Sequence, residues 1–162
     1  MNVFISLLIW MVKLNIGIDA EERFTSNEEL LYSKAWDDTK NILDFSYYLM
    51  GDSAFIALID IIEEQKGVEC LQIQGNNLTD EAVFRLCKSL EDVHHKDIRL
   101  IDISENPSLS DKSATALWSL VARLPNLAEI RIDSCPLISK SKKSILDFKL
   151  DEKRTSLSKK DS

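Results

Sequence analysis

The feature that most constrains the fold is an apolar pattern that recurs about every 30 residues. The segment 68–76, VECLQIQGN, has apolar residues at its first, fourth and sixth places and an asparagine at its ninth. The segments 98–106, IRLIDISEN, and 127–135, LAEIRIDSC, repeat it after steps of 30 and 29 residues, with Cys135 replacing the last asparagine. Such a period indicates stacked structural units.

Each copy changes from strand-like alternation to apolar residues at helical spacing. Asp80 and Asp111 stand at the predicted helix starts, where a carboxylate can cap free backbone N–H groups. The last helix is expected around residues 141–148. In the first two full copies the apolar helix positions correspond: Val83, Leu86 and Leu90 in one match Ala114, Leu117 and Val121 in the other.

A degenerate copy of the unit lies 28 residues before the first full copy. Leu43 and Phe45 provide its strand alternation, Tyr48 replaces the asparagine, and Asp52 precedes its helix. The chain therefore has one degenerate unit, two good units and one terminal unit whose helix is rich in lysine.

A single unit of this size cannot bury its apolar face, whereas stacked units bury it together. The sequence therefore predicts an α/β fold, a short solenoid with a parallel sheet on the concave side and helices on the convex side. Asn76 and Asn106 end two predicted strands. Each is expected to hydrogen-bond backbone groups that the turn removes from the sheet ladder.

The segments LQIQGNNLTDEAVFRLCKSL and IRLIDISENPSLSDKSATALWSLV resemble the leucine-rich repeat family in its ribonuclease-inhibitor-like form, which has strand–helix repeats of 28–30 residues. The resemblance covers roughly residues 40–149. Cys135 at the asparagine position is a variant that the family accepts, whereas Tyr48 departs from its pattern. The resemblance implies a non-enzymatic module that binds another protein, which is an inference from fold to function.

The rest of the chain divides into three segments around the repeats at 40–150. Residues 1–20 are apolar up to Val12, and three interpretations remain open: a packed N-terminal cap, a cleaved secretory signal, and an anchor or a wrongly chosen start. Residues 21–39 are predicted to form a capping helix that includes Trp36. Residues 151–162 are polar and are predicted to be a disordered tail.

The sequence gives no support for an enzyme, a cofactor or a metal site. The two histidines, His94 and His95, are adjacent and are expected to be solvated loop residues. The three cysteines have no CxxC spacing, which favours free thiols. A net charge of −7 argues against nucleic acid as a partner, and the apolar start is too short to favour a membrane span.

Binding is expected on the strand residues that point away from the helices, because alternate residues of a strand face opposite sides. An apolar stripe within this set favours a protein partner, unless the N-terminal segment lies over it. Asp102 and Arg131 are expected to form an ion pair. The predicted rows across the four strands are Ile42, Cys70, Leu100 and Glu129; Asp44, Gln72, Asp102 and Arg131; and Ser46, Gln74, Ser104 and Asp133.

Two functional hypotheses follow. The first is a cytoplasmic adaptor, or a subunit of a larger assembly, that binds a protein on the repeat sheet. The alternative is a secreted or surface recognition protein with a cleaved signal, for which Asn77 in the sequon Asn77-Leu78-Thr79 would be a glycosylation site. A third and weaker hypothesis is an enzyme, for example a ubiquitin-ligase accessory, but no residues in the sequence supply a reaction.

Overall fold

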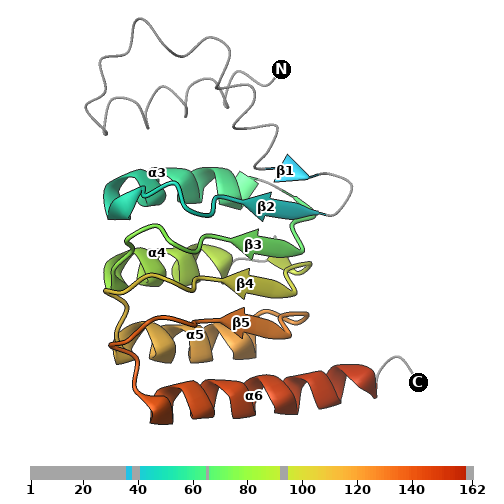
Figure 1. The fold of residues 1–162 in the computed structure, drawn as a ribbon. Coiled ribbons are helices and arrows are strands. Elements are labelled where there is room, and N and C mark those ends of the chain that lie inside the picture. Colours follow the sequence, from blue (N-terminus) through green and yellow to red (C-terminus); the bar gives the residue numbers. More distant parts are fainter. Residues whose placement is uncertain (1–35, 38–40, 65, 92–94, 160–162) are drawn as a thin grey trace, which may run out of the picture.

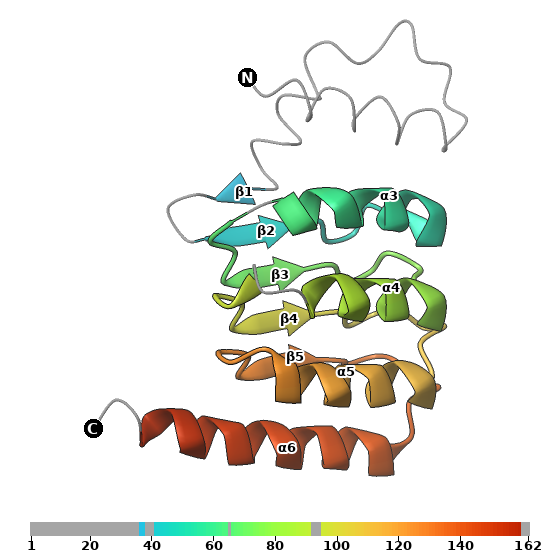
Figure 2. The same ribbon diagram turned by 180° about the vertical axis from the view of Figure 1, so that it is seen from behind.

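The protein is a stack of four strand–helix units, seen in a computed structural model that describes residues 36–37, 41–64, 66–91 and 95–159. The strands form one layer and the helices the other (Figures 1 and 2). The elements in chain order are β1 (Trp36–Asp37), β2 (Ile42–Asp44), α3 (Gly51–Glu64), β3 (Cys70–Gln72), α4 (Asp80–Leu90), β4 (Leu100–Asp102), α5 (Asp111–Arg123), β5 (Glu129–Arg131) and α6 (Lys140–Ser158).

The sheet has the order β1-β2-β3-β4-β5, with β2 to β5 parallel and β1 antiparallel to β2. Leu71 pairs with Ile101 and Ile101 with Ile130, so equivalent residues of successive units are direct neighbours. The α/β solenoid predicted from the repeat is confirmed. The register follows from the apolar pattern, because a slip of one residue would turn every core side chain toward solvent.

The core lies between the two layers and continues through all four units. Leu43, Leu71, Ile101 and Ile130 point into it from the sheet and are at most 6% exposed. Burying a side chain of this size contributes about 1.5–3 kcal/mol. Because each buried face meets the helices of its own unit and the strands of its neighbours, no unit is stable by itself.

Two buried asparagines connect successive units where the strands end. Asn106 accepts hydrogen bonds from the N–H groups of Asn76 and Leu78, both 3.0 Å away. Its amide donates to the carbonyl of Ile103, in its own unit, and to that of Ile73, in the preceding unit. Asn76 likewise donates to the carbonyl of Phe45 in the first unit, at 2.8 Å. The predicted role of both asparagines is confirmed.

The two units without this asparagine use weaker contacts at the same place. The Sγ atom of Cys135 lies 3.8 Å from the carbonyl oxygen of Ile103, and a thiol is a weak donor. Tyr48 in the first unit places its ring edge-on to that of Phe45, with the ring centroids 6.3 Å apart. The first unit can omit the asparagine because Asn76 bonds its carbonyl from the next unit.

Replacing Asn106 by alanine is expected to lower the free energy of unfolding by roughly 2–4 kcal/mol, because buried backbone N–H and C=O groups lose their partners. Urea denaturation followed by circular dichroism measures the change. Asn77→Gly is the matched control, since Asn77 is exposed and has φ 56°, which glycine adopts freely. It should change the stability by less than about 0.5 kcal/mol. Equal losses in the two variants would contradict the role of Asn106.

The helix-start aspartates do not cap their own helices, which corrects the expectation from sequence. Thr79, Ser110 and Ser139 are the N-caps of α4, α5 and α6, each accepting from a backbone N–H of the first turn. Each aspartate instead accepts hydrogen bonds from the N–H and the hydroxyl of the N-cap in the following unit. These pairs are Asp52 with Thr79, Asp80 with Ser110, and Asp111 with Ser139.

These carboxylates therefore link the units on the helix side of the stack. The Ser110 N–H lies 2.9 Å and its hydroxyl 2.6 Å from Asp80, which also accepts from Ser113. Burial acts to raise the pKa of Asp80, but hydrogen bonds from Ser110 and Ser113 together outweigh it, so the pKa lies below its ordinary value. Lys140 occupies the equivalent place in the last unit.

A carboxyl group whose pKa is lower in the folded protein adds stability above the unfolded pKa, near 4, and loses it as the pH falls through the folded value. Asp80→Asn is therefore expected to be less stable than the wild type at pH 7. The difference in urea midpoint should shrink as the pH falls from about 5 to about 2. Glu81→Gln, in an exposed pair with Arg85, is the control and should have little effect at any pH. A difference that persists unchanged at low pH would contradict this assignment.

Three further expectations about the described residues are wrong. Trp36 lies in a strand and not in a helix, because Trp36–Asp37 pairs with β2. Residues 151–158 continue α6 and are not disordered: Leu150 is buried, and Lys153 donates to the carbonyls of Val121, in the last turn of α5, and of Leu124, its C-cap. A cation is favoured at the C-terminal end of a helix. The proposed cap or signal at 1–20, and the rest of the predicted capping helix, lie outside the described residues.

The third concerns the histidines. His95 is only 3% exposed, whereas a solvated loop residue was expected. Its carbonyl accepts from the N–H of Ile98, so the loop folds back toward β4 at this point. His94 lies outside the described residues.

Candidate protein-binding face

The outward side chains of the four parallel strands stand in rows across the sheet. The pairing of β2, β3, β4 and β5 brings Ile42, Cys70, Leu100 and Glu129 into one row. The same register aligns Asp44, Gln72, Asp102 and Arg131 in a second row. The N–H groups of Tyr47, Gly75 and Glu105 each donate to the carbonyl of the third-row residue in the following unit. These bonds extend the alignment to the third row, which is Ser46, Gln74, Ser104 and Asp133.

The first row carries the apolar stripe. Ile42, Cys70 and Leu100 are all half-buried, so part of each side chain reaches solvent on the outer face. Burial raises the pKa of the Cys70 thiol, so it stays protonated at neutral pH and is a poor nucleophile. All three cysteines are free in the structure. The stripe is therefore a surface for apolar contact.

The second row contains the expected ion pair, in a more buried setting than the sequence indicated. Arg131 lies 3.6 Å from a carboxylate oxygen of Asp102 and 2.6 Å from one of Glu129. Asp102 is only 7% exposed and also accepts from the N–H of Ser104 at 3.0 Å. The hydrogen bond to Glu129 raises the pKa of Arg131, which keeps the guanidinium charged.

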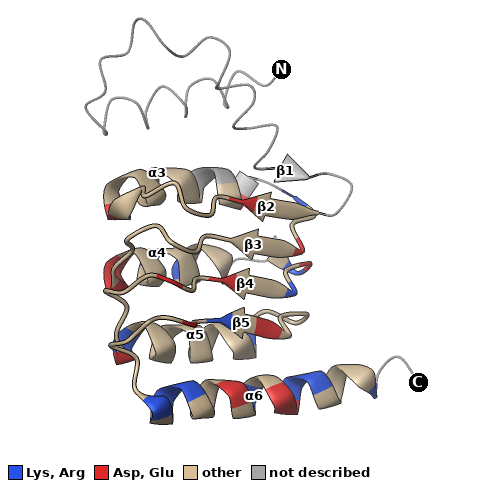
Figure 3. Ribbon diagram, in the orientation of Figure 1, with Lys and Arg blue, Asp and Glu red and all other residues tan. Residues whose placement is uncertain are grey.

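Outside the apolar stripe, the outer face is acidic. Carboxylates stand at the ends of β2 and β4 and at the start of β5, and Arg131 is the main cation among them (Figure 3). Arg131 contacts both Asp102 and Glu129, so its single positive charge balances only one of these two negative charges. The carboxylates on the face are Asp44, Asp102, Glu105, Glu129 and Asp133. A partner on this face would meet a negative potential.

An aromatic turn borders the face, and the sequence analysis missed it. Tyr47 is 58% and Leu49 69% exposed, and both have positive φ, 61° and 53°. The Tyr47 hydroxyl donates to Glu105 at 2.8 Å, two units away. Gly75 and Glu105 occupy the equivalent left-handed position in the next two units. The signal in the sequence was Tyr-Tyr-Leu standing where the next unit has Gly-Asn-Asn.

Gly75 is required for the placement of Tyr47. A Cβ atom at position 75 would lie 2.4 Å from Cδ1 of the Tyr47 ring, and Gly75 itself has φ +68°. The ring therefore lies directly over the glycine backbone and its hydroxyl extends to Glu105. A non-glycine residue here is strained both by its backbone and by the collision.

Gly75→Ala is accordingly expected to lower the free energy of unfolding by about 1–3 kcal/mol, from left-handed strain and from displacement of the Tyr47 ring. In the double variant Tyr47→Ser with Gly75→Ala, the stability lost through the collision should be recovered, but not the stability lost through backbone strain. Urea denaturation of the wild type, the two single variants and the double variant measures this coupling. Strictly additive losses would show that the ring does not lie over Gly75. Gly67→Ala is the control for backbone strain alone, because nothing lies within 4 Å of its Cβ position.

Two further features concern the residues that the structure describes. Among them no group of three or more His, Cys, Asp or Glu side chains is placed to hold a metal ion. In the same part of the chain no helix is long and apolar enough to cross a membrane. What the face supplies is shape, partly exposed apolar side chains and negative charge, which suit contact with another macromolecule.

Comparison with known proteins bears on the fold. No family model matches the chain, and no curated protein matches it. Among solved structures it is similar to a tropomodulin C-terminal domain from Caenorhabditis elegans, with a TM-score of 0.57, 18% identity, and coverage of 74% of this chain and 71% of that one. The repeats, their register and this similarity agree. The chain has an α/β strand–helix repeat fold like that of the leucine-rich repeat proteins.

At this level of identity the similarity shows the fold alone. This repeat fold explains why outward residues thirty positions apart in the sequence share a row. It also gives the rows a common support, and no described element lies over the outer side of β2 to β5.

Proposed function

We propose that the protein is a non-enzymatic interaction module, an adaptor or a subunit of a larger assembly, that binds a protein partner on the outer face of its repeat sheet. The observation that supports this most directly is the Tyr47–Leu49 turn. It exposes Tyr47 and Leu49, and the Tyr47 ring is held in place by its contacts with Gly75 and Glu105. Exposed apolar groups held rigidly beside polar ones are typical of protein contacts.

The sheet face adds the other features of an interface. Its second and third rows are polar, whereas its first row is apolar in β2, β3 and β4, so a partner would meet apolar contacts beside a charged strip. The proposed binding residues all belong to the three rows. They are Ile42, Asp44, Cys70, Gln72, Gln74, Leu100, Asp102, Ser104, Glu129, Arg131 and Asp133. Asp102 and Ser104 are largely buried and would act by holding Arg131 and the turn in place.

We propose the cytoplasm as its location, because three free thiols suit a reducing compartment. The alternative, secretion with a cleaved signal, draws on the exposed Asn77 of the sequon. The mass of the intact chain from its native host distinguishes the two. A full-length mass without a glycan supports the cytoplasm, and a shortened or glycosylated chain supports secretion.

The binding proposal is tested by substituting Leu100 with glutamine and Tyr47 with serine in the tagged full-length chain expressed in its native host. Both variants should stay folded and should reduce, by at least about tenfold, the recovery of partners that the wild type enriches reproducibly. Trp118→Gln is the matched control, because Trp118 is 44% exposed on the helix layer. Binding on the sheet would be contradicted if both face variants retained every partner that the wild type enriches, or if the wild type enriched none.

A further inference from the structure

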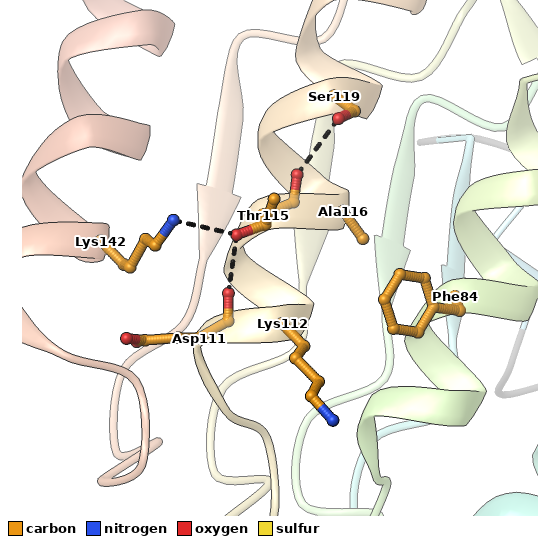
Figure 4. Close-up of a pocket in the computed structure, with 7 residues that line it drawn as sticks. All are labelled: Phe84, Asp111, Lys112, Thr115, Ala116, Ser119 and Lys142. Atoms are coloured by element: carbon orange, nitrogen blue, oxygen red, sulfur yellow. Dashed lines mark hydrogen bonds between the residues drawn. The ribbon is translucent and has the colours of Figure 1, made fainter.

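A second surface lies on the opposite side of the molecule, between α4 and α5. Phe84 on α4 is 46% exposed and points toward Ala116 on α5 (Figure 4). Two adjoining hollows of about 410 and 450 Å³ share Phe84, Ala116 and Ser119 as lining residues. Together they form a continuous groove along the two helices, which we call the Phe84 groove.

The Phe84 groove is positively charged, in contrast to the sheet face. Its two hollows are lined by two carboxylates, Asp111 and Glu91. Asp111 is occupied by its hydrogen bonds to Ser139, and Glu91 pairs with Arg123 at 3.2 Å. The cations that line the same hollows are Arg85, Lys88, Lys112, Arg123 and Lys142.

Carboxylates of the described residues balance only some of these cations. Arg85 pairs with Glu81 in an exposed contact, and Lys142 donates to the hydroxyl of Thr115 at 3.1 Å. No carboxylate of the described residues forms an ion pair with Lys88 or Lys112. The groove thus combines an exposed aromatic ring with lysines whose charge is not balanced locally, which favours an apolar and acidic occupant.

The length of the groove fits a helix. The stretch of α5 from Lys112 to Arg123 advances about 16 Å, roughly three helical turns at 1.5 Å per residue. The groove lies between helices, with no sheet edge to which an extended peptide could add. A helix laid in such a groove contacts it through residues at i, i+3, i+4 and i+7.

We propose that the Phe84 groove binds an acidic amphipathic helix of a partner protein. The apolar side of that helix packs on Phe84 and Ala116, and its carboxylates pair with Lys112 and Lys88. This surface is on the other layer from the sheet face and is independent of the function proposed for that face. A protein with both surfaces would hold two partners at once.

The test uses the full-length protein and three synthetic peptides of about 15 residues, a length at which amphipathic helices begin to form. All three carry leucine at the same i, i+3, i+4 and i+7 positions, and the remaining polar positions are glutamate, glutamine or lysine. Fluorescence anisotropy should show the glutamate peptide binding most tightly, with affinity that falls as salt rises from 50 to 500 mM. Phe84→Ala and Lys112→Glu should each weaken it roughly tenfold.

Leu137→Ala and Lys96→Glu are the controls, since both residues are exposed and lie outside the groove. They should leave peptide affinity unchanged, as should Leu100→Gln on the sheet face. Circular dichroism establishes that each variant is folded. The proposal is overturned if the three peptides bind equally, if the glutamate peptide fails to bind, or if Phe84→Ala and Lys112→Glu have no effect. It is also overturned if sedimentation shows that Phe84→Ala dissociates a dimer, because a second copy would then occupy the groove.

Discussion

Hydrogen bonds between units satisfy the backbone at every place where this chain turns from strand to helix. On the sheet side, Asn76 and Asn106 bond carbonyl groups of the unit before them. On the helix side, Asp52, Asp80 and Asp111 accept from the unit after them. Since a buried polar group without a partner costs about 1–3 kcal/mol, a unit separated from its neighbours would lose these bonds as well as its apolar contacts. The stack therefore folds as one cooperative body.

The fold could be predicted from the sequence because its main signals are periodic. Leu71, Ile101 and Ile130 stand at matching places in their units, and that alone specifies neighbouring rungs of a parallel sheet. The capping pattern could not be predicted in the same way. An aspartate beside a threonine or serine is consistent with capping by either residue, and only the three-dimensional stack brings Asp80 to Ser110, thirty positions away. The helical end of α6 was missed because its composition is polar while its support comes from α5.

The candidate site, like the fold, has features that the sequence predicts and features that it does not. Alternation along each strand predicts which side chains share a row, so the alignment of Cys70 with Leu100 follows from the sequence. Burial within a row does not follow from alternation, and Asp102 is covered although it points outward. Tyr47 was missed because it stands in the degenerate unit, where departure from the repeat reads as loss of pattern. Its role depends on Gly75 and Glu105, which belong to two other units.

Lys140 has a consequence for self-assembly. A stack of similar modules can grow into a filament when the last module of one molecule packs against the first module of another. Docking of that kind would bring the helix entry of a first module, where Gly51 stands in place of the threonine or serine of the other modules, against position 140, where the three earlier modules have a carboxylate acceptor. The ammonium group of Lys140 accepts no hydrogen bond and Gly51 has no hydroxyl to donate, so neither end supplies the side-chain bond that joins the other modules. The substitution thus disfavours head-to-tail polymerisation, at a position whose own helix does not need the acceptor.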